Sequence, residues 1–158
     1  MKTYIKFLIN LFNNSFLKIF IIFFIIILIT NILEQVEFFK DIDLNFLYLV
    51  SLSLLNTPSV LFEILPFIFL LSTQIFFIHL IDKNELEVFK YMGLNNMKII
   101  KILALYSFVF GIVLVIFFYN GASILKNSYL LIKNSYSDDN KYLAVITDNG
   151  LWIKDEIN

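Results

Sequence analysis

Long apolar runs and short polar stretches alternate along the chain, and the length of the runs predicts helices that cross a membrane. The first run, residues 16–33, would rise about 27 Å as a helix, which is close to the thickness of the hydrocarbon layer of a bilayer. It follows residues 1–15, in which Lys2 and Lys6 lie opposite Leu8 on a helical wheel. This arrangement predicts an amphipathic helix in the membrane interface ahead of the first transmembrane helix.

Two further membrane spans are expected. Residues 46–81 are apolar but contain Pro58 and Pro66, each of which removes a backbone donor and crowds the preceding turn. We therefore expect one long, kinked second transmembrane helix. Residues 99–119 form the third span, and the polar segment 84–93 separates it from the second.

The lysine distribution predicts the orientation of these spans. The first loop contains a single lysine, Lys40. The N-terminal region and the segment between the second and third spans are richer in lysine, with Lys2, Lys6, Lys18, Lys83, Lys90, Lys98 and Lys101. Because the cytoplasmic loops of membrane proteins are enriched in Lys and Arg, we expect a cytoplasmic N-terminus.

Composition excludes several classes of protein. With 59 % hydrophobic residues and 19 Phe, a soluble fold would leave too much apolar surface in water. All 12 cationic residues are Lys and the net charge is −1, so we expect no nucleic-acid binding. The chain contains no Cys, no glycine-rich phosphate loop and no cluster of metal-ligating side chains. We therefore expect no enzymatic activity, cofactor or metal site in this chain.

The polar segment 84–93, with the sequence NELEVFKYMG, predicts a short helix between two membrane spans. Asp82 with Glu85, or Asn84 with Glu87, would form a capping pair at its start. Gly93 can end the helix in a left-handed conformation.

A helical wheel of this segment has an apolar face with a carboxylate, Glu85, at its centre. The apolar positions are Leu86, Val88, Phe89 and Met92, and the opposite positions are Glu87, Lys90 and Tyr91. Two interpretations remain open. Either the apolar face enters a groove on a partner that supplies a cation to Glu85, or Glu85 only caps the helix and complements its dipole.

Charged residues in or beside the spans are candidates for lining a substrate cavity. Glu63, within the second apolar run, is either a cavity-facing or helix-coupling carboxylate or a group near the outer membrane interface. Glu34 and Lys40, at the outer end of the first span, are the other candidates. Glu63 and His79 would lie about 24 Å apart on one helix, so they cannot form an acid–base pair within this chain.

The end of the chain differs in character from the apolar runs. Residues 120–158 are rich in Asn, Ser and Asp and contain KYLAVITDNGLWIKD. Two β-prone runs around a D-N-G turn predict a hairpin at the start of an extracytoplasmic β domain.

The order and spacing of these features resemble the lipopolysaccharide-export permeases, the LptF/LptG family. The matching segments are TPSVLFEILP with Pro58 and Pro66, NELEVFKYMG with Glu85 and Gly93, and DNGLWIKD after the third span. The last of these is more similar to the G member than to the F member. The match covers the whole chain, although only its second half is specific.

The resemblance implies an α-helical integral membrane protein of the bacterial inner membrane, with three transmembrane helices followed by the start of a periplasmic, jellyroll-like β domain. Such subunits have six spans, so the chain would be the N-terminal half of one. A second homologous permease subunit, a pair of cytoplasmic ATP-binding ABC subunits, periplasmic bridge components and lipopolysaccharide are the implied partners. Residues 84–93 would be the coupling helix that docks in the ATPase.

The chain departs from the family at the outer end of the first span, where the G member uses lysines to contact the phosphates of the lipid. Asn31, Glu37 and Phe38 occupy this region here. Lipid contacts therefore do not transfer residue by residue, and the lipid itself could differ in phosphate content. The alternative function is a membrane-anchored sensor or assembly scaffold, which would not bind a nucleotide-binding ATPase.

Overall fold

The computed structural model describes residues 3–40, 42, 44–136, 145–147 and 150–152. Within these residues the chain forms five helices and two short strands. They are α1 (Thr3–Phe38), α2 (Phe46–Glu63), α3 (Leu65–Asp82), α4 (Glu85–Tyr91), α5 (Asn96–Ser135), β1 (Val145–Thr147) and β2 (Gly150–Trp152).

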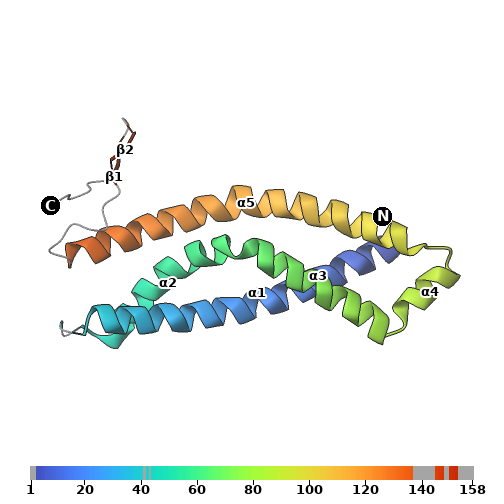
Figure 1. Cartoon of the computed structure of the whole chain (residues 1–158), viewed down its shortest axis with the longest axis horizontal. Helices are drawn as coiled ribbons and strands as arrows, with labels where there is room; N and C mark the ends of the chain where they lie inside the picture. Colours follow the sequence, from blue (N-terminus) through green and yellow to red (C-terminus); the bar gives the residue numbers. More distant parts are fainter. Residues whose placement is uncertain (1–2, 41, 43, 137–144, 148–149, 153–158) are drawn as a thin grey trace, which may run out of the picture.

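The helices build three long rods, which are α1, α2 continued by α3, and α5; the second rod runs antiparallel to the other two (Figure 1). One end of this bundle contains the start of α1, α4 and the start of α5, and we call it the α4 end. The other end contains Phe38, Phe46 and Ser135, and we call it the far end. At 1.5 Å per residue each rod is about 54–60 Å long, whereas a hydrocarbon layer is about 30 Å thick.

Among the residues that the structure describes, four helices, α1, α2, α3 and α5, are long and apolar enough to cross a membrane. Because α2 and α3 follow each other in the same direction along one rod, the chain runs along the length of the bundle three times (Figure 1). Ile21, Ile25 and Ile29 on α1 are each about half exposed, at the spacing of one helix face. Such apolar surface suits contact with lipid rather than water.

Helix α1 is continuous over 36 residues, whereas the sequence predicted an interfacial helix over 1–15 and a separate span over 16–33. No Pro or Gly interrupts this segment, so nothing ends the helix at residue 15. Its first turns also pack inside the bundle. Phe12 is fully buried, and its ring makes edge contacts with the rings of Phe76 and Tyr106.

The second rod is interrupted once, at Ile64. Pro66 lies in the first turn of α3, where its missing N–H removes the donor that the carbonyl of Phe62 would receive in a continuous helix. Pro58, in contrast, lies inside α2 and does not end it. The expected interruption of residues 46–81 is therefore found at Pro66 alone.

Helix α5 extends to Ser135, which is 16 residues beyond the predicted end of the third span at 119. The polar residues after Tyr119 were expected to begin the β region. They remain helical because they pack along the bundle, where Ala122 and Tyr129 are buried. The predicted hairpin follows later as β1 and β2, which pair antiparallel with Ile146 opposite Leu151. The turn residues 148–149 lie outside the described residues, and the larger β domain remains a prediction.

An aromatic core joins the three rods in the half of the bundle nearer to α4. The Phe16 ring lies 5.0 Å from that of Phe69 and 5.1 Å from that of Phe110. The Tyr106 ring stacks on Phe110, and its hydroxyl donates to Asn13 Oδ1 over 2.7 Å. Rings that meet edge to face gain energy beyond the burial of their surface, so this core ties α1 firmly to α3 and α5.

Candidate coupling helix and interhelical polar cluster

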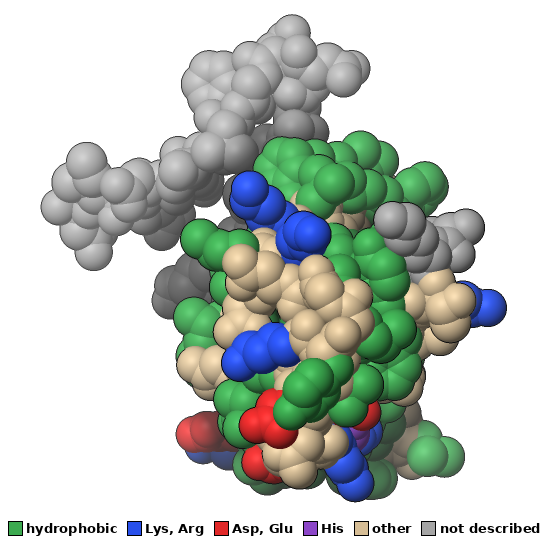
Figure 2. Space-filling model, turned by 90° about the vertical axis from the view of Figure 1, so that its right-hand side faces the viewer, with side chains coloured by type: hydrophobic (Ala, Val, Ile, Leu, Met, Phe, Trp, Pro, Cys, Tyr) green, Lys and Arg blue, Asp and Glu red, His purple; other side chains and the backbone are tan. Residues whose placement is uncertain are grey.

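The short helix α4 connects the second and third rods at the end of the bundle where α1 begins (Figure 1). Figure 2 views the molecule from this end and shows lysine and carboxylate side chains among the hydrophobic ones. Of the charged residues in and beside α4, Asp82, Lys83, Glu87 and Lys90 are exposed, whereas Glu85 is half-buried.

The two ends of α4 are formed differently from each other. Asn84 occupies the N-cap position with a φ of 54°, and its side chain makes no capping hydrogen bond. The predicted Asn84–Glu87 pair therefore lacks its bond from the Asn84 side chain, and Asp82 of the other predicted pair is the last residue of α3 rather than the N-cap of α4. At the other end Gly93 has a φ of +78°, as predicted. Leu94 N–H donates to the Phe89 carbonyl and Gly93 N–H to the Lys90 carbonyl, both over 2.9 Å, which is a Schellman motif.

The inner face of α4 is fixed to the bundle. Phe89 is 7 % exposed, and its ring lies 6.0 Å from the ring of Phe7 on α1. Leu86 packs against the same hydrophobic cluster, which also contains the buried Leu94. Glu85 is half-buried on this side, and its Oε2 atom is buried without a hydrogen-bond partner among the described residues.

The outer face of α4 is strongly exposed and partly apolar. The exposed fractions are 54 % for Val88, 88 % for Tyr91 and 65 % for Met92. Glu87 and Lys90 are exposed as well. The structure thus divides the predicted apolar face, because Leu86 and Phe89 pack against the bundle whereas Val88 and Met92 are largely exposed.

A polar cluster connects all three rods in the far half of the bundle, beyond the aromatic core. Lys126 Nζ of α5 donates to Asn56 Oδ1 of α2 over 2.6 Å, and Asn56 Nδ2 donates to Asn31 Oδ1 of α1 over 3.0 Å. Asn31 Nδ2 in turn donates to Thr57 Oγ1 over 3.1 Å. Asn31, Asn56 and Thr57 are all buried, whereas Lys126 is only half-buried. The ammonium group of Lys126 is therefore the member of this hydrogen-bond network that lies nearest to the surface.

A second group of polar side chains lies one to two helical turns further along. The Tyr129 hydroxyl accepts hydrogen bonds from Gln35 Nε2 and from Lys133 Nζ, both over 3.1 Å. The Lys133 ammonium also lies 4.4 Å from the centroid of the Phe38 ring. The half-buried ammonium groups of Lys126 and Lys133 therefore lie on one side of α5, with the Asn56 amide and the Tyr129 hydroxyl among their partners.

Sequence reasoning did not find this cluster, because its lysines lie in the segment assigned to the β region. The available signal was the spacing of Lys126, Tyr129 and Lys133, which places them on one helix face once 120–135 is recognised as helical. The candidates that the sequence did provide are elsewhere. Glu34 and Lys40 are exposed near the far end, and Glu63 is exposed at the end of α2. Within the described part of the chain, no three His, Asp or Glu side chains gather as metal ligands.

Comparisons with known proteins identify the family of the chain. A family model described as "Lipopolysaccharide export system permease LptF/LptG" matches residues 6–158. No curated protein and no solved structure matches the chain. The family model covers both permeases, so similarity to the G member remains a prediction. Because the match extends over nearly the whole sequence, the chain belongs to the LptF/LptG family of lipopolysaccharide export permeases.

Proposed function

We propose that this chain is part of a transmembrane subunit of an ABC-type lipopolysaccharide export complex in the bacterial inner membrane. A cytoplasmic partner ATPase hydrolyses ATP, and this subunit converts the movement of the ATPase into a movement of its helices beside a lipid cavity. The subunit works beside a second, homologous permease and delivers lipid to periplasmic bridge components. In this proposal the α4 end of the bundle is cytoplasmic.

The observation that carries the proposal is the division of α4 into two faces. The inner face is packed on the bundle through Leu86 and Phe89. The outer face presents Val88, Tyr91 and Met92 to the surroundings. A helix that docks in a partner groove offers apolar anchors on one face, and a helix that transmits force must be attached on the other. Both conditions are met by one seven-residue helix.

The long rods would carry the movement from α4 to the lipid. A displacement of α4 reaches α1 through the contact between Phe89 and Phe7, and it reaches α3 through the two-residue connection 83–84. Helix α1 is continuous, so it moves as a lever, whereas the second rod can bend at Ile64. Domain movements of this kind use a few residues between rigid elements as hinges.

The polar cluster is the part of the chain best suited to contact a phosphorylated lipid. Lys126 Nζ donates to the neutral side chain of Asn56, which orients the ammonium group without neutralising its charge, and Lys133 Nζ donates to the Tyr129 hydroxyl. Oriented ammonium groups bind phosphate as point charges. Asn31 lies near the end of the first predicted span, so the cluster is at the level where lipid headgroups begin. Glu34 and Lys40 remain candidates for the rim of the same cavity.

Substitutions in α4 test the docking proposal. In the complete subunit, Glu85→Ala should weaken association with the ATPase at least tenfold, because the half-buried Glu85 carboxylate, whose Oε2 atom has no partner among the described residues, is available to a cation of the docked ATPase at the first turn of α4. Glu87→Ala, which removes an exposed carboxylate from the same helix, is the matched control and should have little effect. The measurement is a co-purification titration of the ATPase against membranes that contain each variant.

A second substitution separates docking from capping. Val88→Asp places a charge on the exposed apolar face without touching the bundle, and it should abolish ATPase binding while membrane insertion is retained. If Val88→Asp and Glu85→Ala both bind the ATPase like the unaltered subunit, α4 is not the coupling helix. Equal and mild effects of the Glu85 and Glu87 substitutions would assign Glu85 to capping alone.

A further inference from the structure

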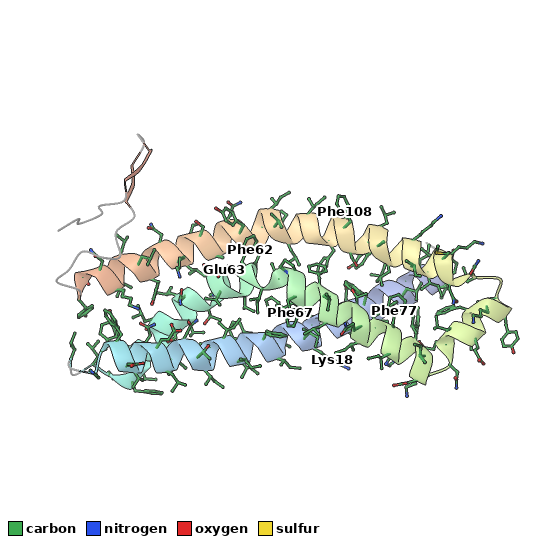
Figure 3. The ribbon with its side chains drawn as sticks, viewed as in Figure 1. Lys18, Phe62, Glu63, Phe67, Phe77 and Phe108 are labelled. Carbon is green, nitrogen blue, oxygen red and sulfur yellow. The ribbon has the colours of Figure 1, made fainter. Side chains whose placement is uncertain are left out.

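Glu63 is an exposed carboxylate near the middle of the second rod (Figure 3). It lies about 26 Å from the start of α2 at Phe46 and about 28 Å from the end of α3 at Asp82, at 1.5 Å per residue. A hydrocarbon layer of about 30 Å, placed anywhere near the centre of a rod of this length, includes Glu63.

The neighbours of Glu63 also place it at the depth of the apolar spans. The ring of Phe62 lies 5.3 Å from that of Tyr119 and 6.4 Å from that of Phe118. Phe118 in turn contacts Phe20 of α1 at 6.0 Å. These rings all belong to long apolar runs, so a carboxylate beside them is surrounded by hydrocarbon wherever protein does not cover it.

The break between α2 and α3 leaves backbone acceptors open beside this carboxylate. Pro66 has no N–H, and Phe67 N–H donates to the Ile64 carbonyl over 3.0 Å instead of to Glu63. The Ile64 N–H donates to the carbonyls of Phe62 and Val60. As a result, the carbonyl oxygens of Leu61 and Glu63 accept no hydrogen bond from any residue that the structure describes.

No cation of the described chain neutralises this group of acceptors. Lys126 Nζ donates to Asn56, which lies about two helical turns from Glu63 along α2, and the described residues show no ion pair between Lys126 and Glu63. Lys18, the other cation at this depth, projects from the opposite side of α1 in Figure 3 and does not point toward Glu63. An unpaired carboxylate and open carbonyls are costly in hydrocarbon, where no water can satisfy them. Intramembrane carboxylates therefore face protein or a cavity and pair with a cation.

We propose that Glu63, through its carboxylate and its own open carbonyl, receives a cationic side chain from a transmembrane helix of the second permease subunit; the Leu61 carbonyl belongs to a buried residue and is not part of this site. A guanidinium group fits best, because its five N–H donors can serve a carboxylate and a backbone carbonyl at once. This chain contains no Arg, so a guanidinium must come from another chain or segment. The proposal rests on the assembly with a second permease, but it does not depend on where the ATPase docks.

A photoreactive amino acid at position 63 tests the proposal in the intact complex in membranes. The expected adduct is a peptide of the second permease that contains a Lys or Arg within a membrane span. The matched control is the same probe at Ile25, which is half exposed on an apolar face of α1 and should label phospholipid. Labelling of phospholipid alone at both positions would overturn the proposal.

A charge-exchange experiment provides a second test of the proposed pair. Glu63→Arg should reduce recovery of the second permease at least tenfold, and substitution of the labelled cation by Glu should restore it. Glu63→Gln has almost the same shape but no charge, so it should fold normally and give a partial loss of recovery of the second permease. Such a loss could not be attributed to misfolding. Unchanged recovery with Glu63→Arg would show that Glu63 faces lipid or an inorganic cation instead. ATPase binding is measured on the same samples, and it should stay normal in every Glu63 variant that still inserts, because α4 is unchanged.

Discussion

The ring of Phe89 on α4 lies 6.0 Å from the ring of Phe7 on α1, and this contact attaches the short surface helix to the first rod of the bundle. Phe89 is almost fully buried, whereas Phe7 is partly exposed at the end of the bundle. The pair therefore joins a helix that faces outward to a helix that extends through the full length of the protein.

Replacement of Phe89 by Ala should uncouple ATP hydrolysis from lipid export. Loss of a well-packed Phe typically costs about 3–5 kcal/mol, which is enough to detach a helix of seven residues from its support. In a reconstituted complex we expect ATP hydrolysis to persist while ATP-dependent release of lipid falls at least tenfold. Tyr91→Ala, at an exposed position of the same helix, should leave the thermal stability of the purified subunit unchanged. Full lipid release by the Phe89 variant would contradict the lever described above.

Two glycines should respond to alanine with opposite signs. Gly93 has a φ of +78° and open space around it, so Gly93→Ala should destabilise the protein by about 1 kcal/mol through backbone strain alone. Gly121 lies inside α5, also with nothing near an added Cβ atom, so Gly121→Ala should stabilise it by about 0.5–1 kcal/mol. Thermal unfolding in detergent measures both. A shift of the same sign in the two variants would be inconsistent with the left-handed end of α4.

The polar cluster should contribute to the association of the rods at the far end. Asn56→Ala leaves Asn31 Oδ1 without its donor and Lys126 without its acceptor. Because buried polar groups that lose a partner cost about 1–3 kcal/mol each, the melting temperature should fall by several degrees. Asn127→Ala, an exposed position on α5, is the control and should change it little. Equal melting temperatures for the two variants would mean that the cluster adds nothing to stability.

The orientation of the bundle can be measured with single cysteines, because the chain contains none of its own. Lys40→Cys and Ser135→Cys should react with a membrane-impermeant thiol reagent in intact spheroplasts. Asn95→Cys should react only after the membrane is opened, because the α4 end is expected in the cytoplasm. All three positions are exposed, so a lack of reaction cannot be caused by burial in the subunit. Reaction of Asn95→Cys in intact spheroplasts would show that the α4 end lies outside the cytoplasm and would contradict the expected topology.

The sequence by itself determined the features that depend on local chemistry. Apolar runs longer than about 18 residues can only be buried or placed in lipid, so the membrane class follows from length and composition. Pro66 has no N–H in any fold, and it accompanies the break at Ile64. Gly93 ends α4 because glycine adopts a positive φ without a steric penalty. The motifs around these residues also indicated the family.

The tertiary structure alone decided which partners each side chain meets. A helical wheel grouped Val88 and Phe89 on one face, but it could not show that the bundle covers Phe89 and leaves Val88 exposed. The polar pattern after Tyr119 suggested the end of a helix, yet α5 continues because Tyr129 is buried there and bonds to Gln35 of α1. The bonds of the polar cluster join residues far apart in sequence, so no local pattern records them. The periodicity of the sequence shows that one face of a helix is more apolar than the other. Only the packed fold determines which residues cover that face.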